Sequence, residues 1–97
     1  MTQRFPIAKV IAVDIDGTLV QDGRLHLPLL NWIRERKQEQ FRLMLWSARG
    51  REYVMTTAHR FGVAALCDDL ISKPGLIVDD QGWTWTQYTR RVVLPSA

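Results

Sequence analysis

The stretch VIAVDIDGTLV, from Val10 to Val20, places two carboxylates at the end of an apolar run. Burying an ionised carboxylate without a partner is costly, so a strand that served only to pack would carry Val or Thr in place of Asp14. The plainer interpretation is a strand that ends at Asp14 and continues into a solvated Asp16-Gly17 turn, since Asp and Gly are common turn residues. The remainder of the chain decides between a site and a plain turn.

The composition is that of an ordinary globular protein. The chain has 97 residues, 46% hydrophobic and 24% charged, and we expect one domain over residues 1–97. Cys67 is the only cysteine, which excludes an internal disulfide framework and fits a reducing compartment. No apolar run is long enough to span a bilayer, and the N-terminus lacks the apolar stretch of a secretory signal. We therefore expect a soluble, cytoplasmic protein with no membrane partner.

Strand and helix patterns alternate along the chain. The apolar run Ile7–Asp14 predicts a strand buried on both faces, and Phe41–Trp46 predicts a second strand. Between them, Pro28 suits the first turn of a helix, which the spacing of apolar residues extends from about 28 to 40. The same spacing predicts a second helix over Glu52–Phe61.

Two further strands are expected after Gly62, which is placed to cap the second helix. One lies near Ala65–Cys67 or at Leu70–Ile71, and the other is Leu76–Val78, which Asp79-Asp80 ends. The alternation implies right-handed crossovers and a mostly parallel sheet. The predicted fold class is α/β, a three-layer α/β/α Rossmann-like fold.

Reactive side chains follow the predicted strands. Asp14, Ser47 and Asp79 each lie at the carboxyl end of one, so they should meet at one edge of the sheet. In chain order DIDGTL, the serine of LMLWSARG, Lys73 and IVDD closely resemble the four motifs of the haloacid dehalogenase (HAD) superfamily of phosphatases. The resemblance covers most of the chain. It implies a HAD-like fold and a Mg²⁺-dependent phosphatase.

The first motif supplies the covalent chemistry of such an enzyme. Asp14 would attack the phosphorus and form an aspartyl-phosphate, which splits one hard displacement into two easier ones. Asp16 would protonate the leaving oxygen and later activate water, as a general acid/base. Gly17 lets the backbone approach the phosphate, and the Thr18 hydroxyl steadies the turn.

A cation is needed because a carboxylate attacking a phosphate dianion meets like charge. Asp14 and Asp79 are hard oxygen ligands suited to Mg²⁺, the expected cofactor. The resemblance implies the backbone carbonyl of Asp16 as a third ligand. Asp80 would reach the metal through water or orient its neighbours.

In such reactions, hydrogen-bond donors and positive charges that contact the transferring phosphoryl group contribute most to catalysis. The Ser47 hydroxyl and the Ala48 N–H would donate to its oxygens, and Lys73 would add a point charge. Arg49 would contact substrate anions, or is a solvated residue at the start of a helix.

Each later motif also has a plain structural interpretation. Ser47 could cap the following helix, which Gly50 could equally open; Lys73 could be a solvated loop lysine, and Asp79-Asp80 a turn. Lys73 and Asp79 are separated only by residues 74–78, where many members of the family have a helix. This short spacing departs from the pattern of those members, but a short K-P-x-(apolar)-D-D segment also resembles small members of the superfamily, so Lys73 is kept as the motif lysine.

No cap domain fits between the motifs, because residues 17–46 and 48–72 each hold one helix and its loops. The resemblance therefore points to a small capless type with an open site. Capless relatives act on large substrates or close the site with a neighbouring subunit, so a homo-oligomer is one expected partner.

The expected substrate is a phosphorylated small molecule: a metabolite, sugar or nucleotide. A phosphatase of nucleic-acid ends is a second hypothesis, motivated by Arg90-Arg91 and by Trp83 and Trp85, which the WTWT alternation places on one strand face for base stacking, core packing or a subunit contact. The net charge of +3, without a basic block, permits nucleic acid but does not require it. A non-enzymatic phosphoacceptor and a binding module are the third and fourth hypotheses, although receiver domains carry the acceptor Asp on the third strand.

Overall fold

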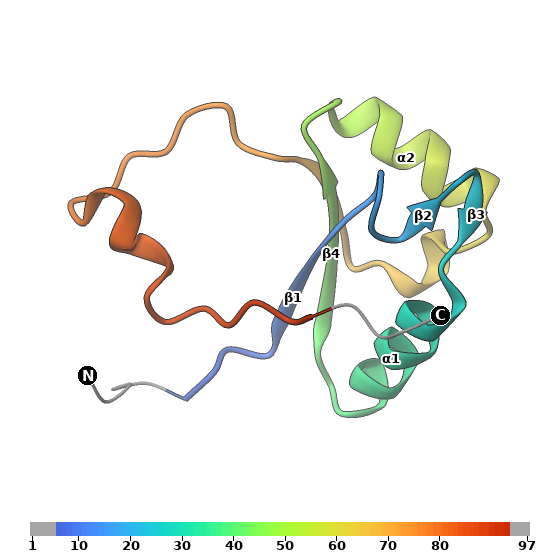
Figure 1. Ribbon diagram of the computed structural model, residues 1–97, viewed down its shortest axis with the longest axis horizontal. Helices are drawn as coiled ribbons and strands as arrows, with labels where there is room; N and C mark the ends of the chain where they lie inside the picture. Colours follow the sequence, from blue (N-terminus) through green and yellow to red (C-terminus); the bar gives the residue numbers. More distant parts are fainter. Residues whose placement is uncertain (1–5, 94–97) are drawn as a thin grey trace.

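Strands and helices alternate through most of the chain, as the sequence predicts (Figure 1). The computed structural model describes residues 6–93. Its elements, in order, are β1 Val10–Asp14, β2 Val20–Gln21, β3 Arg24–Leu25, α1 Leu27–Gln38, β4 Arg42–Ser47, α2 Arg51–Arg60 and β5 Asp69–Ser72. Two 3₁₀ turns, Ala64–Leu66 and Gly82–Thr86, complete them.

The three longer strands form one parallel sheet in the order β1-β4-β5. In this ladder Asp14 pairs with Trp46, and Trp46 pairs with Ile71, so the three strands end at nearly the same level. The α/β class and the parallel sheet are therefore confirmed. Both predicted helices form close to their expected bounds, and β5 confirms Leu70–Ile71 as the site of the third strand.

The core lies on one face of the sheet. Along β4 every second side chain is buried, and Leu43 and Leu45 are only 3% and 1% exposed. Ile33 of α1 and Val54 of α2 pack in the same buried cluster, at 1% and 0% exposure. Because side chains alternate across a strand, Trp46 of β4 points to the opposite face.

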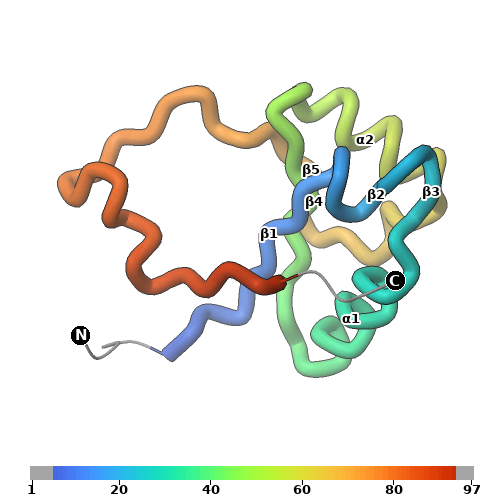
Figure 2. Tube along the Cα trace, viewed as in Figure 1, coloured from blue at the N-terminus to red at the C-terminus, as the bar shows by residue number. Residues whose placement is uncertain are grey.

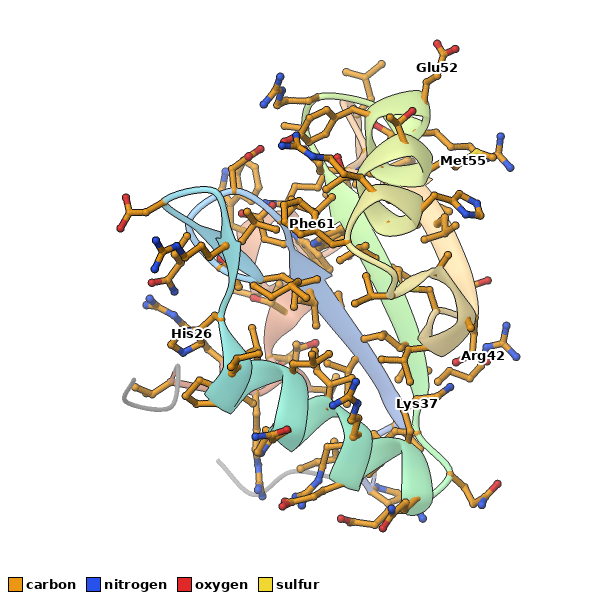
Figure 3. All side chains as sticks on the ribbon, turned by 90° about the vertical axis from the view of Figure 1, so that its right-hand side faces the viewer. His26, Lys37, Arg42, Glu52, Met55 and Phe61 are labelled. Atoms are coloured by element: carbon orange, nitrogen blue, oxygen red, sulfur yellow. The ribbon has the colours of Figure 1, made fainter. Side chains whose placement is uncertain are left out.

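Both helices cover this same face (Figures 1 and 3), so the described residues form two layers and not the three that the sequence predicts. The cause is the strand order. From β1 to β4 and from β4 to β5 the chain moves across the sheet in one direction, and right-handed crossovers in one direction place their helices on one face. A helix on the second face requires a strand on the other side of β1.

The predicted strand at Leu76–Val78 does not form. Leu76 is 92% exposed and Val78 is fully exposed, and the segment after β5 leaves the sheet in a wide excursion before it returns toward β1 (Figure 2). A parallel neighbour needs a crossover of about a dozen residues, and only Lys73, Pro74 and Gly75 stand between β5 and Leu76. The local pattern is strand-like, but the chain is too short to place it in the sheet.

Two other predictions are wrong for related reasons. The first strand begins at Val10, not Ile7, and is not buried on both faces, because β1 is an edge strand and Val10 is 47% exposed. Trp83 and Trp85 lie in the 3₁₀ turn Gly82–Thr86 and not on a strand, and Trp83 is 87% exposed. The described part of the chain therefore gives Trp83 no place in the core.

Asp68 joins three elements at the end of the sheet opposite the strand carboxyl ends. Its carboxylate pairs with Lys37 of α1 and accepts a hydrogen bond from the N–H of Leu43 at 2.7 Å, while its own N–H donates to the carbonyl of Leu43. The hydrogen bond from Lys37, followed by that from Leu43, lowers the pKa of this carboxyl. In Figure 3 Lys37 lies at the end of α1, near the start of β4.

We predict that Asp68→Asn lowers the free energy of unfolding by about 1–2 kcal/mol at neutral pH, since it removes a charge-assisted hydrogen bond. A carboxyl whose pKa is lowered by folding stabilises the native state above its unfolded pKa, about 3.9. That contribution is lost as the pH falls through the folded pKa, so the difference from the wild type should vanish in acid. Urea denaturation at pH 7 measures the loss, and a series of acidic pH values below the unfolded pKa measures how the difference shrinks.

Asp69→Asn is the matched control. Its pair with Arg42, at 3.3 Å, is more exposed than that of Asp68, and we expect a loss below about 0.5 kcal/mol. Equal losses for the two variants would contradict the role given to Asp68.

Candidate functional site

The carboxyl ends of the three parallel strands bring together residues that are far apart in sequence. Asp14 is the last residue of β1, Ser47 the last of β4, and Lys73 directly follows β5. The Lys73 Nζ lies 3.2 Å from the Asp14 Oδ1, and the Lys73 N–H donates to the carbonyl of Ser47 at 3.0 Å. Lys73 is therefore not a solvated loop lysine but part of this edge.

The turn after β1 presents Asp16 to solvent. Ile15 is fully buried and anchors the turn, and its carbonyl accepts hydrogen bonds from the N–H groups of Thr18 and Val20, both at 3.0 Å. Gly17 has φ +76°, a conformation that favours glycine because other residues are strained there. The predicted turn at Asp16-Gly17 is confirmed, and it projects the second carboxylate beyond the strand end.

A tyrosine and an arginine from the α2 region hold the Asp16 carboxylate. The Tyr53 hydroxyl donates to its Oδ1 at 2.8 Å, and the Arg49 Nη1 lies 3.6 Å from its Oδ2. The Arg49 guanidinium also stacks on the Tyr53 ring, 3.8 Å from the ring centre. Tyr53 is not expected at the site from the sequence, because its helical spacing places it with the apolar residues of α2.

Ser47 makes a structural hydrogen bond, but it is not the helix cap that the sequence allows. Its side chain is buried, 2% exposed, and its Oγ accepts a hydrogen bond from the N–H of Arg49 at 3.0 Å. The N-cap of α2 is Gly50 and not Ser47. Ser47 therefore shapes the loop that carries the exposed Ala48 and Arg49 at the mouth of the site.

The charges of the site are balanced in pairs. Asp14 faces Lys73, and both side chains are about one third exposed (35% and 37%). Asp16 faces Arg49, and these are more exposed, 52% and 62%. Ion pairs this accessible contribute little to stability, so both carboxylates remain available for further interactions.

A pocket of about 330 Å³ opens beside Asp16. It lies between the β2–β3 hairpin and α2, and Asp22, Tyr53, Arg60 and Phe61 line it. Figure 3 shows Phe61 on the hairpin side of α2. A small organic group in this pocket would lie next to the Asp16 carboxylate.

Asp79 and Asp80 do not join these residues. The Asp79 Oδ1 accepts a hydrogen bond from the N–H of Gln81 at 2.8 Å, and the Asp80 Oδ2 accepts one from the Gln81 side chain at 3.0 Å. Both carboxylates thus form a local turn on the segment that leaves the sheet (Figure 1). In residues 6–93 no three side chains of the His, Cys, Asp or Glu type lie close enough to hold a metal ion together.

The donor set for Mg²⁺ is therefore only partly assembled within the described chain. Mg²⁺ takes one or two carboxylates together with waters and phosphate oxygens. The Asp14 carboxylate at the end of β1 and the Asp16 main-chain carbonyl in the turn that follows are oxygen ligands of the kind this set needs. The acidic pair expected to complete it lies elsewhere in this chain.

We predict that Lys73→Met changes the free energy of unfolding by less than about 1 kcal/mol, because the side chains of Lys73 and Asp14 are each about one third exposed. Ser47→Ala should cost about 1 kcal/mol, because it leaves the Arg49 N–H without its acceptor. Denaturant titration of both variants tests this order. A larger loss for Lys73→Met would show that the pair is structural.

Comparison with known proteins assigns no family to this geometry. No protein-family model matches the chain, and the searches of curated proteins and of solved structures give no significant match. Within residues 6–93, no helix is long and apolar enough to cross a bilayer. Any functional conclusion therefore rests on the residues and contacts of the site itself.

Proposed function

We propose that this chain is a small, capless phosphatase of the HAD type, with a Rossmann-like fold, that hydrolyses phosphate monoesters through an aspartyl-phosphate on Asp14. The observation that supports it most is the convergence of Asp14 and Lys73, 3.2 Å apart, with the outward-facing Asp16 carboxylate in the turn that follows β1. A strand-end carboxylate beside a cation and a second carboxylate is the arrangement that this chemistry needs.

In the first step an Asp14 carboxylate oxygen attacks the phosphorus. The new P–O bond to Asp14 forms as the P–O bond to the leaving group breaks, and protonated Asp16 gives its proton to the leaving oxygen. Lys73 moderates the repulsion between the Asp14 carboxylate and the phosphoryl group. The alcohol then departs through the open side of the site.

In the second step the Asp16 carboxylate takes a proton from a water molecule, which attacks the phosphorus. Inorganic phosphate leaves, and the Asp14 carboxylate is restored, while Asp16 is again protonated. Tyr53 and Arg49 act here as positioning residues, because both contact the Asp16 carboxylate. The exposed Ala48–Arg49 loop can donate its Ala48 N–H to the phosphoryl oxygens, whereas the Arg49 N–H already bonds Ser47.

Mg²⁺, when bound, would supply positive charge that offsets the repulsion between the Asp14 carboxylate and the phosphoryl group. Asp14 and the carbonyl of Asp16 would hold it, together with an Asp79 carboxylate brought to the strand edge.

The pocket beside Asp16 favours a small leaving group. Its volume of about 330 Å³ and its mixture of aromatic and charged side chains suit a phosphorylated metabolite, sugar or nucleotide. The tryptophans that motivated a nucleic-acid substrate lie on the segment that leaves the sheet, and Trp83 is directed to solvent. Neither Trp83 nor Trp85 lines the pocket beside Asp16.

We predict that Asp14→Asn abolishes phosphate release, by at least about a thousand-fold, while the free energy of unfolding changes by less than about 1 kcal/mol. Hydrolysis of p-nitrophenyl phosphate with Mg²⁺ measures this, and EDTA should silence the wild type reversibly. Borohydride should trap the aspartyl-phosphate as homoserine at position 14. Asp69→Asn, at the opposite end of the sheet, is the control with full activity.

Retained activity in Asp14→Asn would reject Asp14 as the nucleophile. A stable adduct on Asp14 without turnover would instead favour a phosphoacceptor.

We further predict that Tyr53→Phe lowers kcat about tenfold, the value of one hydrogen bond of about 1.4 kcal/mol, with little change in KM. Thr56→Val, a change on the exposed side of the same helix, is the control. An unchanged kcat, or a loss of activity that appears only as a raised KM, would reject the positioning role of Tyr53.

A further inference from the structure

The outer edge of β1 has no strand partner among the described residues. In the order β1-β4-β5, β1 pairs with β4 on one side only. Val10 is 47% exposed and Ala12 is exposed as well. An open edge with free N–H and C=O groups is a template for a further strand.

A groove follows this edge. It has a volume of about 790 Å³, and its walls are β1, part of α1 and the returning segment of residues 88–93. Leu29 and Trp32 border it on the helix side, and Val92 and Val93 border it on the other. The groove is thus largely apolar and continues to Asp14, at the candidate site.

A segment with a strand-like sequence is exposed on the same chain. Leu76, Ile77 and Val78 are 92%, 46% and 102% exposed, although two of them are β-branched residues that favour strands. The carboxylates of Asp79 and Asp80 follow directly. Apolar side chains this exposed, next to an acidic pair, indicate a segment that is buried against a partner.

The chain cannot place this segment beside its own β1 in the parallel sense. From Ser72 to Leu76 it spans at most about 14 Å. The position outside β1 lies three strand spacings from β5, about 14 Å sideways, and its amino end lies four residues back along the strands, roughly 13 Å. The separation is then about 19 Å, which exceeds the reach of the linker.

We infer that a second copy of this chain supplies the strand, and that two copies exchange residues 76–80 reciprocally. A strand from the partner, parallel to β1, extends the sheet and buries its apolar residues in the groove. Its acidic pair then follows the end of that strand, at the level of Asp14. The acidic pair then lies at the edge where Lys73 pairs with Asp14 and Arg49 with Asp16.

The active site is therefore shared between two subunits. The inference of a strand exchange depends on the sheet edge, the groove and the linker length. The inference that the exchanged Asp79 completes a metal site depends also on the proposed phosphatase function.

Mixing two inactive variants tests the shared site. Asp14→Asn and Asp79→Asn should each be inactive alone, but a heterodimer combines one intact Asp14 with one intact Asp79. After equal amounts are unfolded and refolded together, about a quarter of the wild-type activity should return, because half of the dimers are mixed and each has one complete site.

The matched control mixes Asp14→Asn with Lys73→Met. Lys73→Met should be impaired, and Lys73 lies beside Asp14 of its own subunit. Neither site of that heterodimer is complete, so the mixture should recover no activity. No recovery in the mixture of Asp14→Asn with Asp79→Asn would overturn the shared site, and equal recovery in both mixtures would overturn it as well.

A cross-link tests the exchange without any activity. In a Cys67→Ser background, chains with Ala12→Cys and chains with Ile77→Cys are mixed and oxidised. They should form a disulfide-linked heterodimer on a non-reducing gel, while Ala12→Cys with Thr56→Cys, on the exposed side of α2, should not. Sedimentation should show a dimer, and Ile77→Asp should make it a monomer.

A monomeric wild type without the cross-link would overturn the exchange. A chain carrying both Ala12→Cys and Ile77→Cys that links only to itself at high dilution would show its own segment in the groove, and would overturn it too. A cross-linked dimer without phosphatase activity would reject the proposed function and leave the exchange standing.

Discussion

The aligned carboxyl ends of β1, β4 and β5 are the constraint on which the rest of the structure depends. Parallel pairing through Val13, Leu45 and Leu70 holds the strands at one level, so that Asp14 and Lys73, far apart in sequence, stand 3.2 Å from one another. The helices bury one face of the same strands and fix this register, because a slip of one residue would turn Leu43 and Leu45 to the open face. The candidate site therefore follows from packing of the core.

The sequence was sufficient for elements whose pattern is local. Apolar spacing located α1 and α2, alternation along β4 follows its buried face, and Asp16-Gly17 forms the expected turn. The same reasoning placed Asp14 and Ser47 at one sheet edge, because parallel strands share a carboxyl end, and Lys73 joins them there. What these residues do chemically remains a prediction of the sequence and of its resemblance to the HAD superfamily.

Features that depend on distance along the chain were not predictable from local pattern. Leu76–Val78 looks like a strand, but strand formation requires a neighbour within reach, and Lys73-Pro74-Gly75 is too short to provide one. Tyr53 looks like a core residue, and only the turn that projects Asp16 toward α2 gives its hydroxyl a partner at 2.8 Å. Periodicity reports which face a residue occupies but not which side chain it meets there.

The short linker after β5 explains why the sheet ends at β1 and why the acidic pair lies apart from Asp14. In a two-layer fold with both helices on one face, the sheet can grow only at its open edges, and the groove makes the β1 edge the more favourable of the two. An exposed Leu-Ile-Val segment that cannot reach that edge in its own chain gains buried area only against another copy. The same strand of the partner then provides both the apolar contact and the carboxylates that follow it. Dimer formation therefore also completes the candidate site.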